Sequence, residues 1–372
     1  IKHESYQPTK TEEFGDDLVI YPVDGYGSQD IVRSILRTEK PDIVWFMTDP
    51  RFWAWLWEME DEIRPLAPMV YYHVWDNYPY PDFNETAYSS NDAIVAISKL
   101  THDIVQNVVP HVDSHYIPHA VDPEIFQPIS AEEKLEFREK FMPEAKDKFV
   151  VFWNNRNARR KMPGSLIFYF NEFLNQVGRD KAQLIMHTDP HDQHGPNLEA
   201  ILHNLNLVNG EVKLSNQKVE SAQLAMMYNV SDVTINISDA EGFGLSTLES
   251  LSCGTPIIVN MTGGLQEQVT DGEDWFGVGI EPAAQAVIGS QDIPYIYEDR
   301  VSQQSVVDAL VEMYEKKEQL RDIGLMGRNH VLKNYSFESF CKSWDLFLKS
   351  MHDKHGSWEN RKNYKAWELV EV

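Results

Sequence analysis

The sequence predicts an α/β protein with two doubly wound, Rossmann-like units, each a parallel sheet between layers of helices. Short apolar runs rich in β-branched and aromatic residues alternate with segments whose apolar residues recur at helical spacing. This alternation stops in a charged stretch at 130–147 and then begins again. Strands that alternate with helices form parallel sheets, and 372 residues suit two domains of about 150 residues each.

The first predicted unit covers residues 1–140. Residues 1–17 are polar and predict no element, and a glycine-containing turn at 24–28 precedes the first helix. We expect strands at 18–23, 41–47, 68–76, 92–98 and 115–118, and helices at 29–37, 52–62 and 99–108.

The second predicted unit covers residues 141–335, and a helical segment at 336–372 follows it. The boundary near Lys140 falls inside the charged stretch. We expect strands at 148–153, 182–187, 212–214 and 233–237, and helices at 163–177, 197–205, 221–230, 245–251, 305–321 and 337–351.

Charge and cysteine content restrict the class of protein. A formal net charge of −25 and an isoelectric point near 4.8 argue against nucleic acid as a partner. Two cysteines are too few for a disulfide framework and fit a reducing, cytoplasmic setting. No apolar run has the length of a membrane span, and no signal peptide is visible. The chain begins with Ile1 and not with Met, which leaves its native start open.

The stretch 238–268 carries the strongest functional signal. It follows an apolar, β-rich run, and Gly242 and Gly244 come directly before helical spacing that starts at Leu245. Glycines allow the backbone to approach a ligand closely, and the free N–H groups of a first helical turn favour an anion such as phosphate. The stretch lacks both the Lys-Ser/Thr ending of a Walker loop and the three-glycine dinucleotide fingerprint, so it indicates neither an ATPase nor an oxidoreductase.

Two carboxylates, Glu241 and Glu249, flank this turn. A helical path between them would separate their Cα atoms by about 12 Å, which is wide for the acid and nucleophile of a glycosidase. We expect each carboxylate to accept hydrogen bonds from hydroxyl groups on either side of the phosphates. The alternative is one solvated Glu and one Glu on a helix face.

Three motifs here resemble, in order and spacing, the donor-site signature of family 4 retaining glycosyltransferases. They are Glu241 and Glu249 with Gly-Phe-Gly-Leu between them, Cys-Gly-Thr-Pro-Ile-Ile from Cys253, and Gly-Gly-Leu-Gln-Glu from Gly263. The resemblance implies the GT-B architecture, in which two Rossmann-like domains face each other across a cleft and the last helix crosses back to the first domain. It also implies transfer of a sugar from a nucleoside-diphosphate sugar to an acceptor hydroxyl, with retention of anomeric configuration and without cofactor or metal.

A basic loop at 155–161 follows the first predicted strand of the second unit. Arg156 and Lys161 are close enough in sequence to reach one pyrophosphate, where a guanidinium fork and an ammonium would offset the charge of a leaving nucleoside diphosphate. They stand where the phosphate contacts of the resembled family stand. Arg159 and Arg160 compete for these roles, and a loop that is merely solvated is the alternative.

The resemblance implies roles for further residues. Glu241 would orient the sugar hydroxyls and Glu249 the ribose, while Asn216 lies where the family backbone holds the nucleobase. His73 resembles a first-domain His that lies close to the donor sugar, although a His at a strand end is more often structural. The implied catalytic residues are Glu241, His73, Arg156 and Lys161, and the implied donor-binding residues are Gly242, Phe243, Gly244, Leu245, Glu249 and Asn216.

The run at 187–194 is rich in His and Asp, as metal sites are. It is a predicted loop after a strand and lacks fixed helical geometry, so we expect no metal there.

One part of the family pattern is missing. Members normally begin with a strand, a glycine-rich loop and a helix ahead of the position of Leu18, and only the turn at 24–28 offers a weak substitute. We therefore expect an incomplete acceptor half and retain two alternatives, a non-catalytic sugar-nucleotide-binding subunit and a glycosidase or phosphorylase. The sequence leaves open whether the donor is a UDP- or GDP-sugar, whether the acceptor is a glycan, a lipid-linked molecule or a protein, and whether the chain forms an oligomer.

Overall fold

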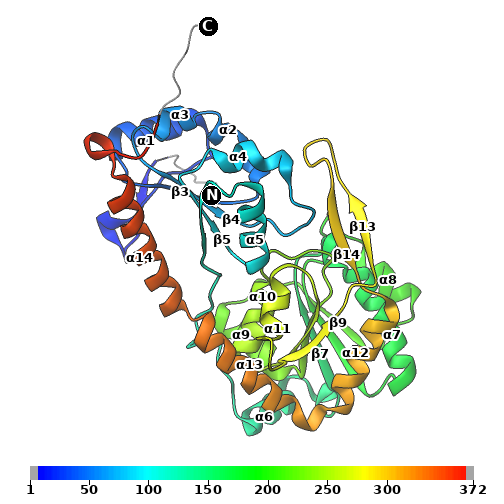
Figure 1. The fold of residues 1–372 in the computed structure, drawn as a ribbon. Coiled ribbons are helices and arrows are strands. Elements are labelled where there is room, and N and C mark those ends of the chain that lie inside the picture. Colours follow the sequence, from blue (N-terminus) through cyan, green and yellow to red (C-terminus); the bar gives the residue numbers. More distant parts are fainter. Residues whose placement is uncertain (1–6, 366–372) are drawn as a thin grey trace.

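The structure is a computed structural model that describes residues 7–365. Two α/β domains, each with a parallel sheet, confirm the predicted fold class. Figure 1 shows the first domain in blue and cyan, and the second from green to orange. A yellow hairpin and the last long helix extend from the second domain to the first.

The first sheet has four parallel strands in the order β3-β4-β5-β6. Its central strands are apolar and fully buried, as expected for a sheet that is covered on both faces. The strands are β3 (Val44–Thr48), β4 (Met69–His73), β5 (Ala93–Ala96) and β6 (Asp113–Tyr116), and the helices of this domain are α1 (Gln29–Glu39), α2 (Ala54–Trp57), α3 (Glu60–Ile63), α4 (Glu85–Ser89) and α5 (Lys99–Val108).

Two expected elements of the first domain differ from the prediction. The strand expected at 18–23 shrinks to β2 (Val19–Ile20), which pairs antiparallel with β1 (Thr9–Lys10) and does not join the parallel sheet. Pro22 lacks the amide hydrogen that a longer ladder would need. The single helix expected at 52–62 is divided into short pieces.

The second sheet has six parallel strands in the order β12-β11-β10-β7-β8-β9. Its strands are β7 (Phe149–Asn154), β8 (Ala182–His187), β9 (Val212–Ser215), β10 (Val233–Asn236), β11 (Ile257–Asn260) and β12 (Gly277–Ile280). Its helices are α7 (Pro163–Val177), α8 (Leu198–Asn204), α9 (Ser221–Val230), α10 (Leu245–Ser252), α11 (Gln266–Val269), α12 (Gln303–Glu315) and α13 (Leu320–Asn334).

Alternation along the strands divides the apolar core into layers. In β7, Val151 and Trp153 belong to one buried cluster and Phe152 to another, because successive side chains point to opposite faces of a sheet. The cluster that contains Phe152 continues into the first domain, where it includes Val70 and Tyr72 of β4. One apolar cluster therefore continues from a face of the first sheet into the second domain.

Helix α14 (Phe337–His355) covers part of the same face. Figure 1 shows it running from the second domain along the first. Its Trp344 packs against Trp45 and Tyr72, with ring centroids 5.7 and 4.9 Å away. Lys354 near its end forms an ion pair with Asp113 of β6 at 2.7 Å. Residues 366–372 of the predicted C-terminal segment lie outside the described residues.

Several elements were not anticipated from the sequence, among them β1, α4, β11, α11, β12 and most of α13. Two more lie in the charged stretch and after β12. The charged stretch contains α6 (Ala131–Phe141), which begins with a capping box between Ser130 and Glu133. An antiparallel hairpin, β13 (Ala284–Ile288) and β14 (Ile296–Arg300), follows β12. Among residues 7–365, no helix combines the length and the apolar character of a membrane span.

Candidate functional site

The loops that carry most of the predicted site meet at one place in the second sheet. Strands β8 and β9 lie on one side of β7, whereas β10, β11 and β12 lie on the other. The chain direction of the connections therefore reverses between β7 and β10, and in doubly wound sheets ligands bind beyond the carboxyl ends of the strands at such a switch point. The basic loop follows β7, and the turn with Glu241 follows β10.

A cavity of about 420 Å³ lies at this point, and both domains line it. We call it the interdomain cavity. The first domain contributes Val74, Asp76, Ile97 and His119. The predicted site residues that line it are Arg156, Lys161, Glu241, Gly242, Phe243, Gly244 and Leu245.

Lys161 and Glu241 form an ion pair in the wall of this cavity. The ammonium of Lys161 donates to Oε2 of Glu241, and each side chain is only 11% exposed. Burial lowers the pKa of Lys161, an effect that Glu241 partly offsets. Burial would raise the pKa of Glu241, but the charges of Lys161 and Arg160 bring it below its ordinary value. Each group therefore favours the charged form of the other.

Glycines hold the turn against the rest of the site. Gly244 has a φ of +94° at the start of α10, a conformation that side-chain-bearing residues rarely adopt. Gly263 has a φ of +50°, and a Cβ atom there would lie 1.8 Å from the carbonyl oxygen of Glu241. The same carbonyl accepts a hydrogen bond from the amide of Gly264 at 3.0 Å. The Gly-Gly motif thus fixes the backbone of Glu241.

The arginines of the basic loop have separate partners. Arg156 is 59% exposed at the rim and donates to Asp192 at 2.6 Å. Arg159 forms a bidentate pair with Glu298 of β14. Arg160 donates to the carbonyl of Ala240 and lies 3.8 Å from Asp76.

His73 does not reach the interdomain cavity. Its side chain is fully buried under the first sheet, where Nε2 lies 2.6 Å from the hydroxyl of Tyr88 and Nδ1 accepts from the amide of Trp75 at 3.3 Å. Burial lowers its pKa to about 3, so the ring is neutral. His119 is the imidazole that lines the cavity, and burial lowers its pKa to about 4.

Glu249 and Asn216 also lie outside the lining of this cavity. Glu249 accepts a hydrogen bond from the Tyr228 hydroxyl at 2.7 Å, and that hydroxyl accepts one from Asn154, which does line the cavity. Burial raises the pKa of Glu249 to about 7. Asn216 is exposed directly after β9.

Asp76 is a cavity residue to which the sequence prediction gave no role. It follows β4 and faces Arg160 across the domain interface. Burial raises its pKa to about 6, while Arg160 lowers it. The available signal was its position at the end of the predicted strand 68–76, near which His73 also lies.

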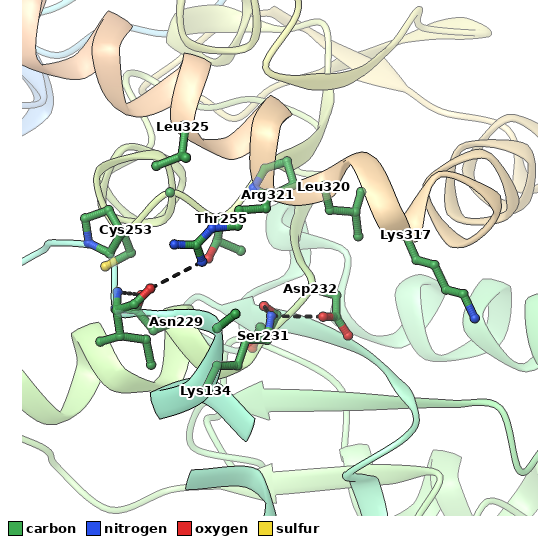
Figure 2. A pocket seen from close by; sticks show the side chains of 15 residues that line it. Lys134, Asn229, Ser231, Asp232, Cys253, Thr255, Lys317, Leu320, Arg321 and Leu325 are labelled. Carbon is green, nitrogen blue, oxygen red and sulfur yellow. Dashed lines mark hydrogen bonds and ion pairs between the residues drawn. The ribbon is translucent and has the colours of Figure 1, made fainter. Parts of the chain in front are cut away.

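A further cavity of about 170 Å³ lies near the opposite ends of the strands of the second sheet. Figure 2 shows Lys134, Asp232 and Thr255 around it, and Asp232 and Thr255 precede strands β10 and β11. Lys134 contacts Asp232 at 2.9 Å. This rear cavity is thus at the amino ends of the strands, away from the switch point. Within the described part of the chain, no three His, Cys, Asp or Glu side chains are grouped so that they could hold a metal ion, and this includes the run at 187–194.

Comparison with known proteins supplies the family. Among curated proteins, D-inositol 3-phosphate glycosyltransferase 2 of Catenulispora acidiphila is 38% identical over 80 residues, which are 21% of this chain and 19% of that protein. D-inositol 3-phosphate glycosyltransferase of Thermomonospora curvata is 42% identical over 66 residues, which are 18% of this chain and 15% of that protein. The chain thus aligns with less than a fifth of the length of these relatives.

Solved structures resemble the whole two-domain arrangement. Sucrose-phosphate synthase from Thermosynechococcus elongatus superposes with a TM-score of 0.70 and 17% identity, over 87% of this chain and 77% of that one. HepE from Anabaena, in complex with UDP-glucose, superposes with a TM-score of 0.67 and 15% identity, over 86% and 82%. The fold is therefore that of GT-B glycosyltransferases. Residues 136–325, just over half of the chain and including the whole switch point, match Glycosyl transferases group 1, so the chain belongs to that family.

Proposed function

We propose that this protein transfers a sugar from a nucleoside-diphosphate sugar to an acceptor hydroxyl with retention of anomeric configuration. The observation that carries this proposal is the placing of Lys161, Glu241 and the start of α10 in one cavity between two domains. The cation suits a diphosphate and the carboxylate suits sugar hydroxyls. The free amides at the start of the helix suit phosphate oxygens.

The diphosphate of the donor would bind between α10 and the basic loop. The amides of Gly244 and Leu245 stand at the start of an eight-residue helix, and Lys161 and Arg160 line the same cavity. Arg156 at the rim would complete the site by releasing Asp192. Positive charge at this place stabilises the nucleoside diphosphate as it leaves.

Glu241 would position the donor sugar and not attack it. Its Oε2 is already engaged by Lys161, with Asn236 and Ser238 each 3.4 Å away. A carboxylate held in this way accepts sugar hydroxyls through its remaining lone pairs. The proton of the acceptor hydroxyl would then pass to the departing phosphate on the same face of the sugar, which is the retaining course.

Glu249 would bind the ribose through the lone pairs that its hydrogen bond with Tyr228 leaves free. Tyr228 connects it to Asn154 in the cavity lining, so the carboxylate lies one side chain behind the wall of the proposed nucleotide site. HepE is described in complex with UDP-glucose, which makes UDP-sugars the first donors to test and GDP-sugars the second.

The test combines binding and turnover. Thermal unfolding of the wild type is measured with UDP, GDP and ADP and with their glucose or mannose derivatives, and release of nucleoside diphosphate is then followed. We expect one nucleotide series to raise Tm and its sugar derivative to be consumed. Stabilisation without consumption would instead favour the non-catalytic binding subunit. Sugar release from a glycoside without any nucleotide would favour a glycosidase.

A further inference from the structure

A second cavity of about 650 Å³ adjoins the interdomain cavity. We call it the hairpin cavity, because residues 288–296 of the β13–β14 hairpin form one of its walls. The two cavities share four lining residues, Val74, Asp76, Arg156 and Arg160. Thr48 at its edge has a φ of +116°, and strain of this kind in a β-branched residue is concentrated at ligand sites. If the donor occupies the interdomain cavity, as proposed above, its reacting sugar lies beside this space.

The hairpin wall is fixed to both domains. Ile293 near its tip is buried in the apolar core of the first domain. The amide of Tyr297 donates to the carbonyl of Tyr78 at 2.6 Å, and the side-chain amide of Asn77 donates to the carbonyl of Tyr297 at 2.7 Å. Figure 1 shows the hairpin extending beside the first domain. The cavity is therefore a built feature of the domain interface.

The charges around the hairpin cavity are compensated in pairs. Arg51 contacts both oxygens of Asp49 at 2.9 and 3.0 Å. Arg159 contacts both oxygens of Glu298 at 2.8 and 2.6 Å, and Glu298 is only 2% exposed.

The two arginines shared with the interdomain cavity are also matched. Arg156 is held by Asp192 at 2.6 Å, and Arg160 lies 3.8 Å from Asp76. Each of the four lining arginines thus has its own carboxylate.

We propose that the hairpin cavity binds the acceptor and that it selects an uncharged, hydroxyl-rich saccharide over a phosphorylated sugar. A phosphate would have to take an arginine from its carboxylate, and in the case of Arg159 it would leave the buried Glu298 with Arg300 as its remaining cation, which is costly. Sugar hydroxyls can instead donate hydrogen bonds to the lone pairs of these carboxylates that the arginines do not use, so that every ion pair stays intact. Ile288, Ile293 and Ile296 of the hairpin offer an apolar wall to the C–H face of a sugar ring.

The experiment measures acceptor choice with the full chain and the donor found by the thermal screen. Glucose, maltose and cellobiose are compared with glucose 6-phosphate and trehalose 6-phosphate, by mass spectrometry of products and by suppression of donor hydrolysis. We expect a neutral saccharide to be glycosylated, or to suppress hydrolysis, at least about tenfold more effectively than its phosphorylated counterpart. Two results would overturn the inference but leave the proposed function standing. One is a preference for a sugar phosphate. The other is a donor that is hydrolysed at the same rate with neutral saccharides, with sugar phosphates and with neither. Failure to bind any donor overturns both.

Two variants test the role of the ion pairs. Glu298→Gln releases Arg159 on the hairpin side, and Asp49→Asn releases Arg51 on the first-domain side, where Asn still caps the following turn. Each should move the ratio of kcat/KM values for glucose 6-phosphate and glucose toward the phosphate by about tenfold. Glu318→Gln, at an exposed site on the second domain, is the matched control and should leave the ratio unchanged. An unchanged ratio in both test variants overturns the inference, even where one of them is less stable.

Discussion

The ammonium of Lys161 contacts the carboxylate of Glu241 across the switch point of the second sheet, although 80 positions separate the two residues in sequence. Each is the other's compensating charge in a place where water has little access. Removing one therefore leaves an unpaired buried charge, so these residues stabilise the fold as well as serving the proposed chemistry.

We predict that Lys161→Ala lowers the free energy of unfolding by about 3 kcal/mol and that it also reduces sugar transfer at least about 100-fold. Urea unfolding and release of nucleoside diphosphate measure the two effects. The double variant Lys161→Met with Glu241→Gln should regain most of the stability, because no isolated charge remains, and should stay inactive. Recovery of activity together with stability would contradict the role of the pair in transfer.

Lys146→Ala is the control for that experiment. Lys146 pairs with Glu139 at 2.7 Å, but both side chains are more than 40% exposed. Such a surface pair contributes less than about 1 kcal/mol. We therefore expect nearly wild-type stability and activity, which distinguishes burial from the simple loss of a lysine.

The sequence predicted those parts whose pattern is local. α7, β8 and α9 have the residue bounds that apolar periodicity indicated. Helix α6 was missed because its apolar side chains Leu135 and Phe141 are largely exposed, so that charge dominates its pattern. The hairpin was missed because the burial of its residues does not follow their polarity, since Val287 is 72% exposed and Glu298 only 2%.

The site residues divide in the same way into those that the sequence predicted and those that it did not. Glu241 and Lys161 were found because each lies in a loop after a strand of one sheet, and parallel strands bring such loops together. Asp76 and His119 were not found as site residues, because their place in the cavity depends on how the first domain packs against the second. The fit of His73 to a family motif could not reveal that its ring turns inward toward Tyr88.

Asp232 beside the rear cavity predicts a pH dependence of stability (Figure 2). Burial opposes its charge, but Lys134 and Arg138 bring the pKa of the carboxyl below its ordinary value of 3.8. An acid whose pKa is depressed by folding stabilises the protein above its unfolded pKa, and this contribution disappears as pH falls through the folded pKa. We expect Asp232→Asn to cost about 3 kcal/mol at pH 7 and the difference from wild type to shrink below about pH 4.

Urea unfolding between pH 3 and 7 tests this, with Asp345→Asn as the control. Asp345 pairs with Lys349 on the surface of α14, and both are more than half exposed. That substitution should cost about 0.5 kcal/mol or less. A loss for Asp232→Asn that is equally small at pH 7 would show that its pairing with Lys134 and Arg138 is not a source of stability.

Alanine substitutions at two glycines with positive φ distinguish the cost of backbone strain from the cost of a steric clash. At Gly272, with a φ of +101°, an added Cβ atom has no neighbour within 4 Å, whereas at Gly263 it would meet the carbonyl of Glu241. We expect Gly272→Ala to lower the free energy of unfolding by about 1 kcal/mol and Gly263→Ala by at least about twice as much. Only Gly263→Ala should weaken nucleotide binding in calorimetry, since it displaces Glu241. If both variants bind the nucleotide with equal affinity, the Gly-Gly motif does not contribute to the donor site.

Glu249 predicts how nucleotide affinity depends on pH. Burial raises its pKa from an ordinary 4.5 to about 7. Because the folded state holds this proton more tightly than the unfolded state, the contribution of the group to stability falls as pH rises from 4.5 to about 7. A ribose diol needs the ionised carboxylate as its acceptor, so binding must release the proton. We therefore expect affinity for UDP or GDP to rise about tenfold between pH 6 and 8.

Inorganic pyrophosphate and two variants distinguish the pH dependence that comes from Glu249 from the one that comes from titration of the phosphates. Pyrophosphate has no ribose, so its affinity should lack the part of the pH dependence that belongs to Glu249. In Glu249→Gln the nucleotide should follow the pyrophosphate profile, and the protein should be more stable than wild type above pH 7, because Gln carries no proton to lose. The exposed Glu318→Gln should keep the wild-type profile. If nucleotide and pyrophosphate have the same pH profile on the wild type, Glu249 does not contact the ribose, and the chain from Tyr228 to Asn154 is a structural support of the cavity wall.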